Sequence, residues 1–232
     1  MRFFFACLLL FSLRAYGQES SPDPPSDPSV STNVPMREIA PGILGIGDVR
    51  LNQTNRTLSF PAVVNLRESL AEYLVVATNG KIHESILRTE AQPYQIHLGM
   101  LLLGAKGANS REFPKDEKDP IPGESMNIEV RWEQDGKTLA VRGEDLARHR
   151  ASQKAMARTH WIYNGSMLYE GLFVAQQEGS IVALYTDAAA LVNFPGPDRD
   201  NDENWEPNAP ALPELESLVE VIFQLEEKAP SP

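Results

Sequence analysis

Two histidines and a glutamate in one short stretch are the side chains best suited to chemistry in this sequence. His83 and Glu84 are adjacent, and His97 follows in the same supersecondary unit. Imidazole nitrogens and carboxylate oxygens bind metals and transfer protons. The pair begins like the zinc-protease motif His-Glu-x-x-His, but Leu87 occupies the place of the second histidine. We therefore predict His83, Glu84 and His97 as binding candidates, although a lone histidine such as His97 is also typical of a hydrogen-bonded core residue.

A second candidate is the densest acidic cluster of the chain, formed by Asp198, Asp200 and Asp202. Its spacing resembles the start of a calcium-binding loop. Glu203 replaces the glycine that such a loop needs, and Ala209 stands where the bidentate glutamate belongs, so an EF-hand is excluded. The cluster stays a candidate for a divalent metal, and the alternative, favoured by the flanking prolines, is a solvated loop.

Other catalytic and modification motifs are missing or open to a simpler interpretation. No nucleophile elbow, Walker loop or dinucleotide-binding fingerprint is present. The only cysteine is Cys7, and its place in an apolar leader excludes disulfides, thiol catalysis and iron–sulfur clusters in the mature chain. Asn164-Gly-Ser166 matches a glycosylation acceptor, but its glycine favours a turn. No cofactor is expected, and a divalent metal is the one that the sequence leaves open.

The elements that must position these residues begin with a hairpin predicted over residues 73–86. Asn79-Gly80 is typical of a two-residue type I′ turn, and the register of that turn pairs Val75 with Glu84. Strand alternation then places Glu84 on the more apolar face and His83 on the other. We expect Glu84 to be the more buried of the two and to have a polar partner. The alternative is a bulge or a sheet margin that lets Glu84 reach water.

An apolar helix is predicted for residues 93–103. Pro93 suits the first turn of a helix and Gly104 suits its end. The helix is apolar nearly all round, which is typical of a buried helix, and it is shorter than the ~20 residues that span a bilayer. If it packs on the Glu84 face of the hairpin, His97 can approach Glu84 as a carboxylate–imidazole pair.

Alternating apolar residues and turn signals predict more strands on both sides of this unit. We expect hairpins at residues 49–60, 128–141 and 172–185, strands at 161–163 and 219–225, and a short helix at 188–192. The predicted fold class is therefore α+β, with mostly antiparallel β-hairpins packed around one buried helix, plus a second short helix.

The first residues predict the compartment. Arg2 precedes an apolar run at residues 3–13, and Ala15 and Gly17 are the small residues expected before a cleavage site. Residues 1–17 are therefore interpreted as a signal peptide. We expect an exported protein, periplasmic or secreted after cleavage near Gly17, with no transmembrane segment in the mature chain.

The domain organisation follows from composition. Residues 18–36 are rich in serine, proline and aspartate, and we expect a disordered tether there. Residues 37–226 are predicted to form a single globular domain, and residues 227–232 a tail.

The charge of the chain bears on its partners. With 32 acidic and 21 basic residues, the net charge is −11, and loss of Arg2 and Arg14 with the leader makes it −13. Nucleic-acid phosphates and anionic membrane surfaces both require basic patches, so neither is an expected partner.

Six blocks of the sequence follow one another in a specific order. They are REIAPGIL at 37–44, SFPAVVN at 59–65, KIHES at 81–85, LLLGAKG at 101–107, WIYNGS at 161–166 and NFPGPD at 193–198. Together they resemble a known family, the YdjY-like domain of exported bacterial proteins. The likeness covers residues 37–225 and implies no established activity and no catalytic roles. It directs attention to residues 81–85 and 193–200 as the first places to look for a site.

Two functions follow from these observations. The first is a non-catalytic binding or interaction module in the cell envelope that recognises an envelope protein or a small ligand. The alternative is a metal-binding protein or metal-assisted hydrolase that uses His83, Glu84 and His97 or the cluster from Asp198 to Asp202. The leader, the tether and the negative motif search favour the first.

Overall fold

The structure is a computed structural model that describes residues 35–108, 113–114 and 118–226. The predicted leader at residues 1–17, the tail at 227–232 and the tether up to residue 34 lie outside the described residues. Met36, the last residue of the predicted tether, already belongs to a strand.

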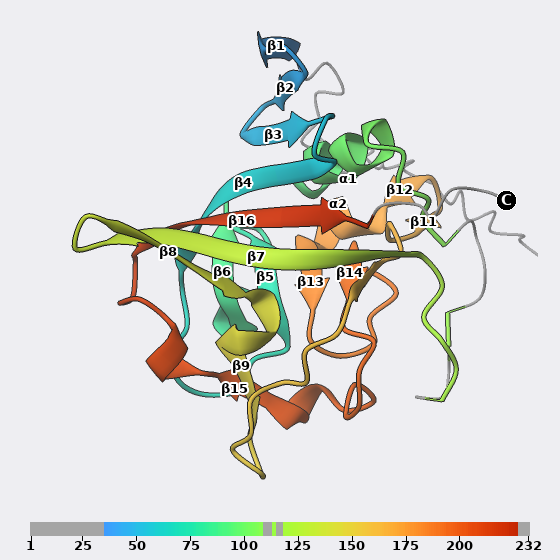
Figure 1. Ribbon diagram of the computed structural model, residues 1–232. Helices are drawn as coiled ribbons and strands as arrows, with labels where there is room; N and C mark the ends of the chain where they lie inside the picture. Colours follow the sequence, from blue (N-terminus) through green and yellow to red (C-terminus); the bar gives the residue numbers. More distant parts are fainter. Residues whose placement is uncertain (1–34, 109–112, 115–117, 227–232) are drawn as a thin grey trace, which may run out of the picture. The chain divides into compact units, whose positions relative to one another are not determined.

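Eight strands close into a β-barrel (Figure 1). In ring order they are β4 (Thr57–Val64), β16 (Leu218–Leu225), β7 (Glu124–Gln134), β10 (Trp161–Tyr163), β14 (Val192–Asn193), β13 (Ser180–Ala183), β5 (Tyr73–Ala77) and β6 (Ser85–Thr89). The ring closes because β6 pairs back onto β4, with Val63 opposite Arg88 and Val64 opposite Leu87. The pairs β5–β6 and β13–β14 are parallel, and the other pairs of the ring are antiparallel.

Shorter elements extend the barrel. Three strands continue outward from β4 as β3 (Val49–Asn52), β2 (Ile43–Ile46) and β1 (Met36–Ala40), and β8 (Lys137–Arg142) forms a hairpin with β7. Two-stranded sheets pair β11 (Leu168–Tyr169) with β12 (Leu172–Phe173), and β9 (Ala147–His149) with β15 (Trp205–Pro207). The helices are α1 (Pro93–Leu102) and α2 (Val174–Glu178), with the 3-10 turns η1 (Ile82–Glu84), η2 (Gly143–Leu146), η3 (Asp202–Asn204) and η4 (Ala209–Ala211).

Strict alternation of apolar residues explains why these strands form a barrel. Every second residue of β4, β7 and β16 is buried, and the residues between them are mostly more exposed. Phe60 of β4 and Phe223 of β16 meet inside with ring centroids 5.3 Å apart in an edge-to-face arrangement. Aromatic pairs of this geometry are favourable beyond their buried area, so the interior is a packed core.

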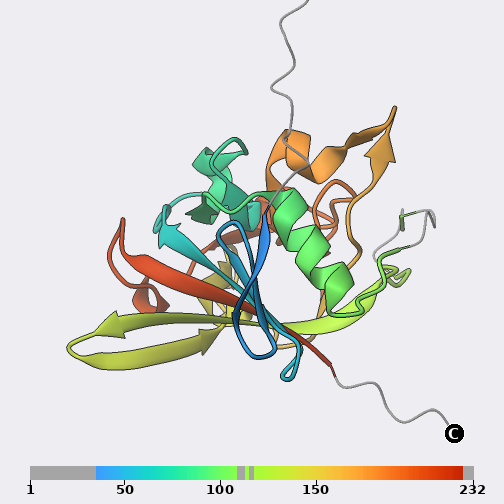
Figure 2. The same ribbon diagram turned by 90° about the horizontal axis from the view of Figure 1, so that it is seen from above.

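The predicted fold class is wrong. The chain is mostly β, with 41% strand and 15% helix, and its core is the barrel rather than a helix. Helix α1 lies beside β3 and β4 (Figure 2) and buries Ile96 and Met100, while Leu101 and Leu102 on its other side are exposed. The helix therefore covers one part of the barrel, and only one face of it belongs to the core. Its predicted limits are confirmed, because Pro93 begins it and Gly104 follows with a φ of 82°.

The hairpin predicted at Asn79-Gly80 is also wrong. Strands β5 and β6 run parallel, with Tyr73 opposite Ser85, and residues 78–84 carry the chain back between them. Asn79 uses its side chain to donate a hydrogen bond to the carbonyl of Gln176 in α2, at 3.1 Å. A Cβ on Gly80 would lie 2.9 Å from the carbonyl oxygen of Glu178. This glycine therefore permits a close approach to α2, and it does not supply the positive φ of a type I′ turn.

Some of the other predicted elements are confirmed and some are wrong. The hairpins at 49–60 and 128–141 and the strands at 161–163 and 219–225 are confirmed. The hairpin at 172–185 is wrong, because residues 174–178 form α2 and Gly179 ends that helix with a φ of 68°. The helix at 188–192 is wrong as well, since Asp187 accepts a hydrogen bond from the Ala189 amide within a turn. No helix in the described ranges is long and apolar enough to cross a membrane.

Candidate functional site

His83 and Glu84 lie in η1, outside the strands that were predicted to carry them. The His83 side chain is 75% exposed and that of Glu84 is 24% exposed, so Glu84 is the more buried, as expected. Its nearest charged groups are His83 Nε2 at 3.6 Å and Lys81 Nζ at 3.8 Å. Both distances exceed a normal hydrogen bond. Glu84 therefore has ionic neighbours at a distance and no short hydrogen bond to either.

Beside Glu84 lies a buried polar cluster that the sequence did not predict. Lys81 Nζ contacts Glu72 Oε2 at 2.7 Å and lies 5.5 Å from the ring centroid of Tyr73. The Tyr73 hydroxyl donates to Asp187 Oδ2 at 3.0 Å and is 3.1 Å from the hydroxyl of Tyr185. Burial raises the pKa of Asp187 above its ordinary value and raises the pKa of Tyr185 to about 12. These contacts join Lys81, the residue before η1, to residues 185–187.

The predicted metal candidates do not converge. Asp198, Asp200 and Asp202 are all exposed, and Asp198 Oδ2 is 3.9 Å from His149 Nε2. Within the described residues, no group of three or more histidine, cysteine, aspartate or glutamate side chains is arranged to hold a metal ion. The acidic segment turns around a hydrogen bond from Asn204 Nδ2 to the Asp198 carbonyl, at 2.8 Å.

His97 lies apart from Glu84 and has a different partner. Its Nδ1 is 2.8 Å from the hydroxyl of Tyr163, and its ring packs against Phe173 with centroids 4.8 Å apart. Glu84 precedes the first residue of β6 and α1 follows the last, so the two residues belong to opposite ends of that strand. The carboxylate–imidazole pair expected between them is not formed.

His97 lines a cavity of about 650 Å³ between α1, the turn after β10 and the β11–β12 hairpin. Figure 2 shows that hairpin, in orange, beside the green helix α1. The lining residues among the described part of the chain carry no formal charge apart from a titratable histidine. They are Tyr94, His97, Ala108, Phe113, Gly165, Ser166, Met167, Leu168, Phe173 and Ala188. We call this space the His97 pocket.

Hydrogen bonds fix two walls of the His97 pocket. Ser166 Oγ donates to the Ala189 carbonyl at 2.6 Å and accepts from the Ala175 amide at 3.1 Å. Gly165 and Ser166 both have positive φ angles, so this segment is the turn that the sequence favoured. The serine hydroxyl is therefore committed to holding the turn at 164–168 against the turn at 187–190.

The buried side-chain amides of Asn164 and Asn193 connect the same two turns by further hydrogen bonds. Asn164 Nδ2 donates to the Ala190 carbonyl at 2.9 Å, and Asn193 Nδ2 donates to Asn164 Oδ1 at 2.8 Å. Asn193 Oδ1 accepts from the Asp187 amide at 2.6 Å. The sequence indicated a turn at Asn164 and marked Asn193 as the start of a segment to inspect, but it did not predict that their side chains pair. An available signal was the position of Asn193 within an apolar run, because a buried amide there must find hydrogen-bond partners.

The electrostatics of the His97 pocket keep its histidine neutral. Burial lowers the pKa of His97 and raises the pKa of Tyr163, so both groups resist ionisation. A buried phenolic O–H needs an acceptor, and within the described ranges His97 Nδ1 is the acceptor that Tyr163 contacts, so we assign the phenol as donor and the imidazole as acceptor. The imidazole proton then resides on Nε2, for which the described residues supply no partner.

Exposed apolar side chains lie on and beside the β11–β12 hairpin. Leu168 is 73% exposed and Tyr169 is 64% exposed on β11, and Met167 and Leu172 are also exposed. Of these, Leu168 and Met167 line the His97 pocket. An apolar hollow with few polar groups is the usual form of a small-ligand site.

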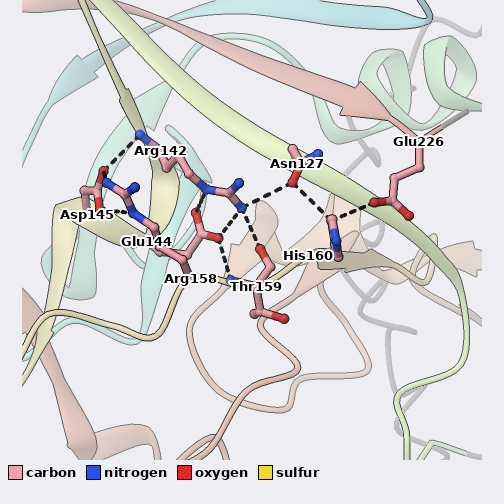
Figure 3. Close-up of polar contacts among 8 residues, drawn as sticks. All are labelled: Asn127, Arg142, Glu144, Asp145, Arg158, Thr159, His160 and Glu226. Atoms are coloured by element: carbon pink, nitrogen blue, oxygen red, sulfur yellow. Dashed lines mark hydrogen bonds and ion pairs between the residues drawn. The ribbon is translucent and has the colours of Figure 1, made fainter.

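A second polar cluster joins β7, β8, η2 and residues 158–160 (Figure 3). Its buried polar groups are hydrogen-bonded to one another. Glu144 is fully buried and receives hydrogen bonds from Arg142 Nη2 at 2.6 Å and from the Thr159 amide at 3.0 Å. The same Arg142 nitrogen donates to the Thr159 carbonyl at 2.7 Å. The donors and acceptors of this cluster are paired with one another, as expected of a hydrogen-bond network that stabilises the fold.

Comparison with known proteins identifies one family. The family model of the YdjY domain matches residues 49–224, which is more than half of the chain. No curated protein and no solved structure matches the sequence.

Proposed function

The chain belongs to the YdjY domain family, and we propose that its domain is a non-catalytic binding module of the cell envelope. The His97 pocket is the proposed ligand site. The export part of the proposal is supported by the pattern of residues 1–17, in which Arg2 precedes an apolar run and small residues follow.

The observation that carries the proposal is the cavity. Its volume of about 650 Å³ lies within the ~300–1,000 Å³ typical of ligand pockets. Its described lining is apolar except for the polar groups of Tyr94, His97 and Ser166, and the Ser166 hydroxyl is already hydrogen-bonded to backbone groups. A neutral imidazole with no carboxylate among its described neighbours suits binding better than acid–base catalysis, because a catalytic base is normally paired with a reacting group or an orienting acid.

A fluorescent probe tests whether the pocket binds apolar molecules. The mature chain, beginning at Gln18, is titrated with N-phenyl-1-naphthylamine, a neutral probe that brightens in apolar surroundings. We expect saturable binding at one site per chain. Ala188→Trp fills the pocket and should abolish the signal, whereas Ala140→Trp on the exposed strand β8 makes the same change of residue away from the pocket and should preserve it.

Two outcomes contradict the proposal. If the unmodified chain shows no saturable binding, the pocket is not a ligand site. If Ala188→Trp binds the probe as well as Ala140→Trp does, the probe occupies another surface.

Export is tested separately by mass spectrometry of the chain purified from a fractionated bacterial producer. We expect a mature N-terminus near Gln18 in the periplasmic or secreted fraction. A chain that keeps Met1 and stays in the cytoplasmic fraction would show that residues 1–17 are not a signal peptide.

A further inference from the structure

The chemical class of the ligand follows from which polar atoms of the His97 pocket are still available. Ser166 Oγ already makes two hydrogen bonds to backbone groups. His97 Nδ1 is occupied by the Tyr163 hydroxyl. Among the described lining residues this leaves His97 Nε2 and the hydroxyl of Tyr94 as side-chain polar groups without a hydrogen bond to another described residue.

The Tyr163 contact makes His97 a donor. A neutral imidazole carries one proton on one of its two nitrogens. Because Nδ1 accepts from the phenol, the proton resides on Nε2, and the packing of Phe173 against the ring restricts its orientation. Gly165 permits the turn to approach the ring closely, since a Cβ there would lie only 3.3 Å from His97 Cε1. The pocket therefore presents a fixed N–H donor, and a donor selects an acceptor.

Tyr94 is a less selective group on the same wall. It precedes His97 by three residues in α1, so both side chains lie on one face of the helix and both line the pocket. A phenolic hydroxyl rotates and can either donate or accept. Tyr94 therefore does not discriminate between ligands that carry a donor and those that carry an acceptor.

The described lining favours an uncharged ligand. None of its side chains is permanently charged, and burial disfavours the charged form of His97. A carboxylate entering such a site loses its hydration without gaining a cationic partner, which is costly. A carbonyl or ester oxygen loses much less.

We propose that the His97 pocket takes an uncharged apolar molecule with a carbonyl oxygen, and that this oxygen accepts a hydrogen bond from His97 Nε2. This inference rests on the proposed function of the pocket as a ligand site. It assigns His97, which the sequence singled out, the role of selecting the ligand by its acceptor.

Three matched probes test the ligand class on the mature chain. They share a naphthalene ring and differ in one substituent: methyl 2-naphthyl ketone, 2-ethylnaphthalene and 2-naphthoate. Competition against N-phenyl-1-naphthylamine gives their relative affinities. We expect the ketone to bind about 2- to 10-fold more tightly than the hydrocarbon, the ratio for one net hydrogen bond. The carboxylate should bind most weakly at neutral pH.

Variants then assign the donor. The double variant His97→Phe/Tyr163→Phe removes both partners of the hydrogen bond and keeps two aromatic rings, so no buried polar group is stranded. We expect it to lose the preference for the ketone, so that the ratio of the two affinities, ketone to 2-ethylnaphthalene, falls to about 1. Tyr94→Phe also removes one hydroxyl from the same wall and should keep the preference.

The outcomes separate the two proposals. If none of the three probes binds the unmodified chain, the proposed function of the pocket fails together with this inference. If all three bind with equal affinity, the pocket is a ligand site but the inference is wrong. A preference for the ketone that survives in His97→Phe/Tyr163→Phe and disappears in Tyr94→Phe would also overturn it, because the donor would then be Tyr94.

Discussion

Glu144 and His97 are both ionisable side chains withdrawn from water, yet they differ in how many hydrogen-bond partners surround them. Glu144 receives hydrogen bonds from Arg142 and from the Thr159 amide, and the guanidinium of Arg142 also binds the Thr159 carbonyl and Asn127 (Figure 3). Within the described residues His97 makes one hydrogen bond, to Tyr163, and its ring borders a cavity.

The comparison separates a structural role from a binding role. A buried charge must be matched by partners within the protein, and once it is matched nothing remains for a ligand. A neutral group such as His97, with one N–H donor that no described residue accepts, lowers the stability of the fold only slightly, and this donor can select a ligand. We therefore expect substitutions in the Glu144 cluster to act on stability, and substitutions at the His97 pocket to act mainly on binding.

The largest expected effect is in the Glu144 cluster. Arg142→Met leaves the carboxylate of Glu144 fully buried beside an apolar side chain. Because the Arg142 side chain is 35% exposed whereas Glu144 is fully buried, the free energy of unfolding should fall by about 3 kcal/mol, the lower end of the range for a broken buried ion pair, as measured by urea denaturation. Arg142→Met/Glu144→Met removes both charges and should recover most of the loss. A single variant as stable as the unmodified chain would show that the ion pair contributes nothing.

A smaller effect is expected at Tyr163, the partner of His97. Tyr163→Phe removes one hydrogen bond between neutral groups, worth about 1 kcal/mol of the free energy of unfolding. Tyr169→Phe deletes the same hydroxyl from an exposed residue of β11 and should change nothing measurable in the same urea titration. Equal effects of the two substitutions would mean that the contact with His97 does not stabilise the fold.

The pH dependence of stability sharpens the comparison further. Burial lowers the folded-state pKa of His97, so the stability gained by keeping it neutral is present above its unfolded pKa of ~6.5 and is lost as pH falls toward the folded value. From about pH 7.5 to about pH 5.5, the unmodified chain should lose more stability than His97→Phe/Tyr163→Phe. Identical losses would show that His97 is not held neutral.

The smallest effect is expected at the solvent-facing end of the Glu144 cluster. Arg158 makes a two-pronged contact with Asp145, with Nε 3.0 Å from Oδ1 and Nη2 2.8 Å from Oδ2. Water screens this ion pair because the guanidinium is exposed, so Arg158→Ala should leave the thermal midpoint nearly unchanged. A loss approaching that of Arg142→Met would mean that the whole cluster acts as one cooperative network.

Two turns of the same type show how far local sequence predicts this fold. Asp135-Gly136 and Asn79-Gly80 both predict a type I′ hairpin. At the first, Asp135 and Gly136 have φ angles of 52° and 70°, and β7 pairs with β8 as expected. At the second, α2 packs against the turn and takes both residues for tertiary contacts. The first hairpin projects from the barrel, so no neighbour competes with its local preference.

In the candidate site as well, the parts that depend on local sequence were predictable and the parts that depend on distant residues were not. The helix that carries His97 was predictable, because Pro93, Gly104 and the apolar run between them are local signals. Its partner Tyr163 was not, because it lies on β10 and reaches His97 only through the closed barrel. Glu84 was expected to approach His97 if α1 packed on the Glu84 face of a hairpin, and the parallel pairing of β5 and β6 shows that this hairpin is not formed.

The sequence by itself determined the strands with alternating apolar residues, the limits of α1, and the family, since each depends on residues close together in the chain or on blocks in a fixed order. Tertiary structure alone decided that β6 pairs with β4 to close the barrel, that β5 and β6 are parallel, and that His97 meets Tyr163 beside a cavity. Period and turn chemistry specify which face of a strand is buried. They do not specify its neighbour, because that choice depends on packing summed over the whole core.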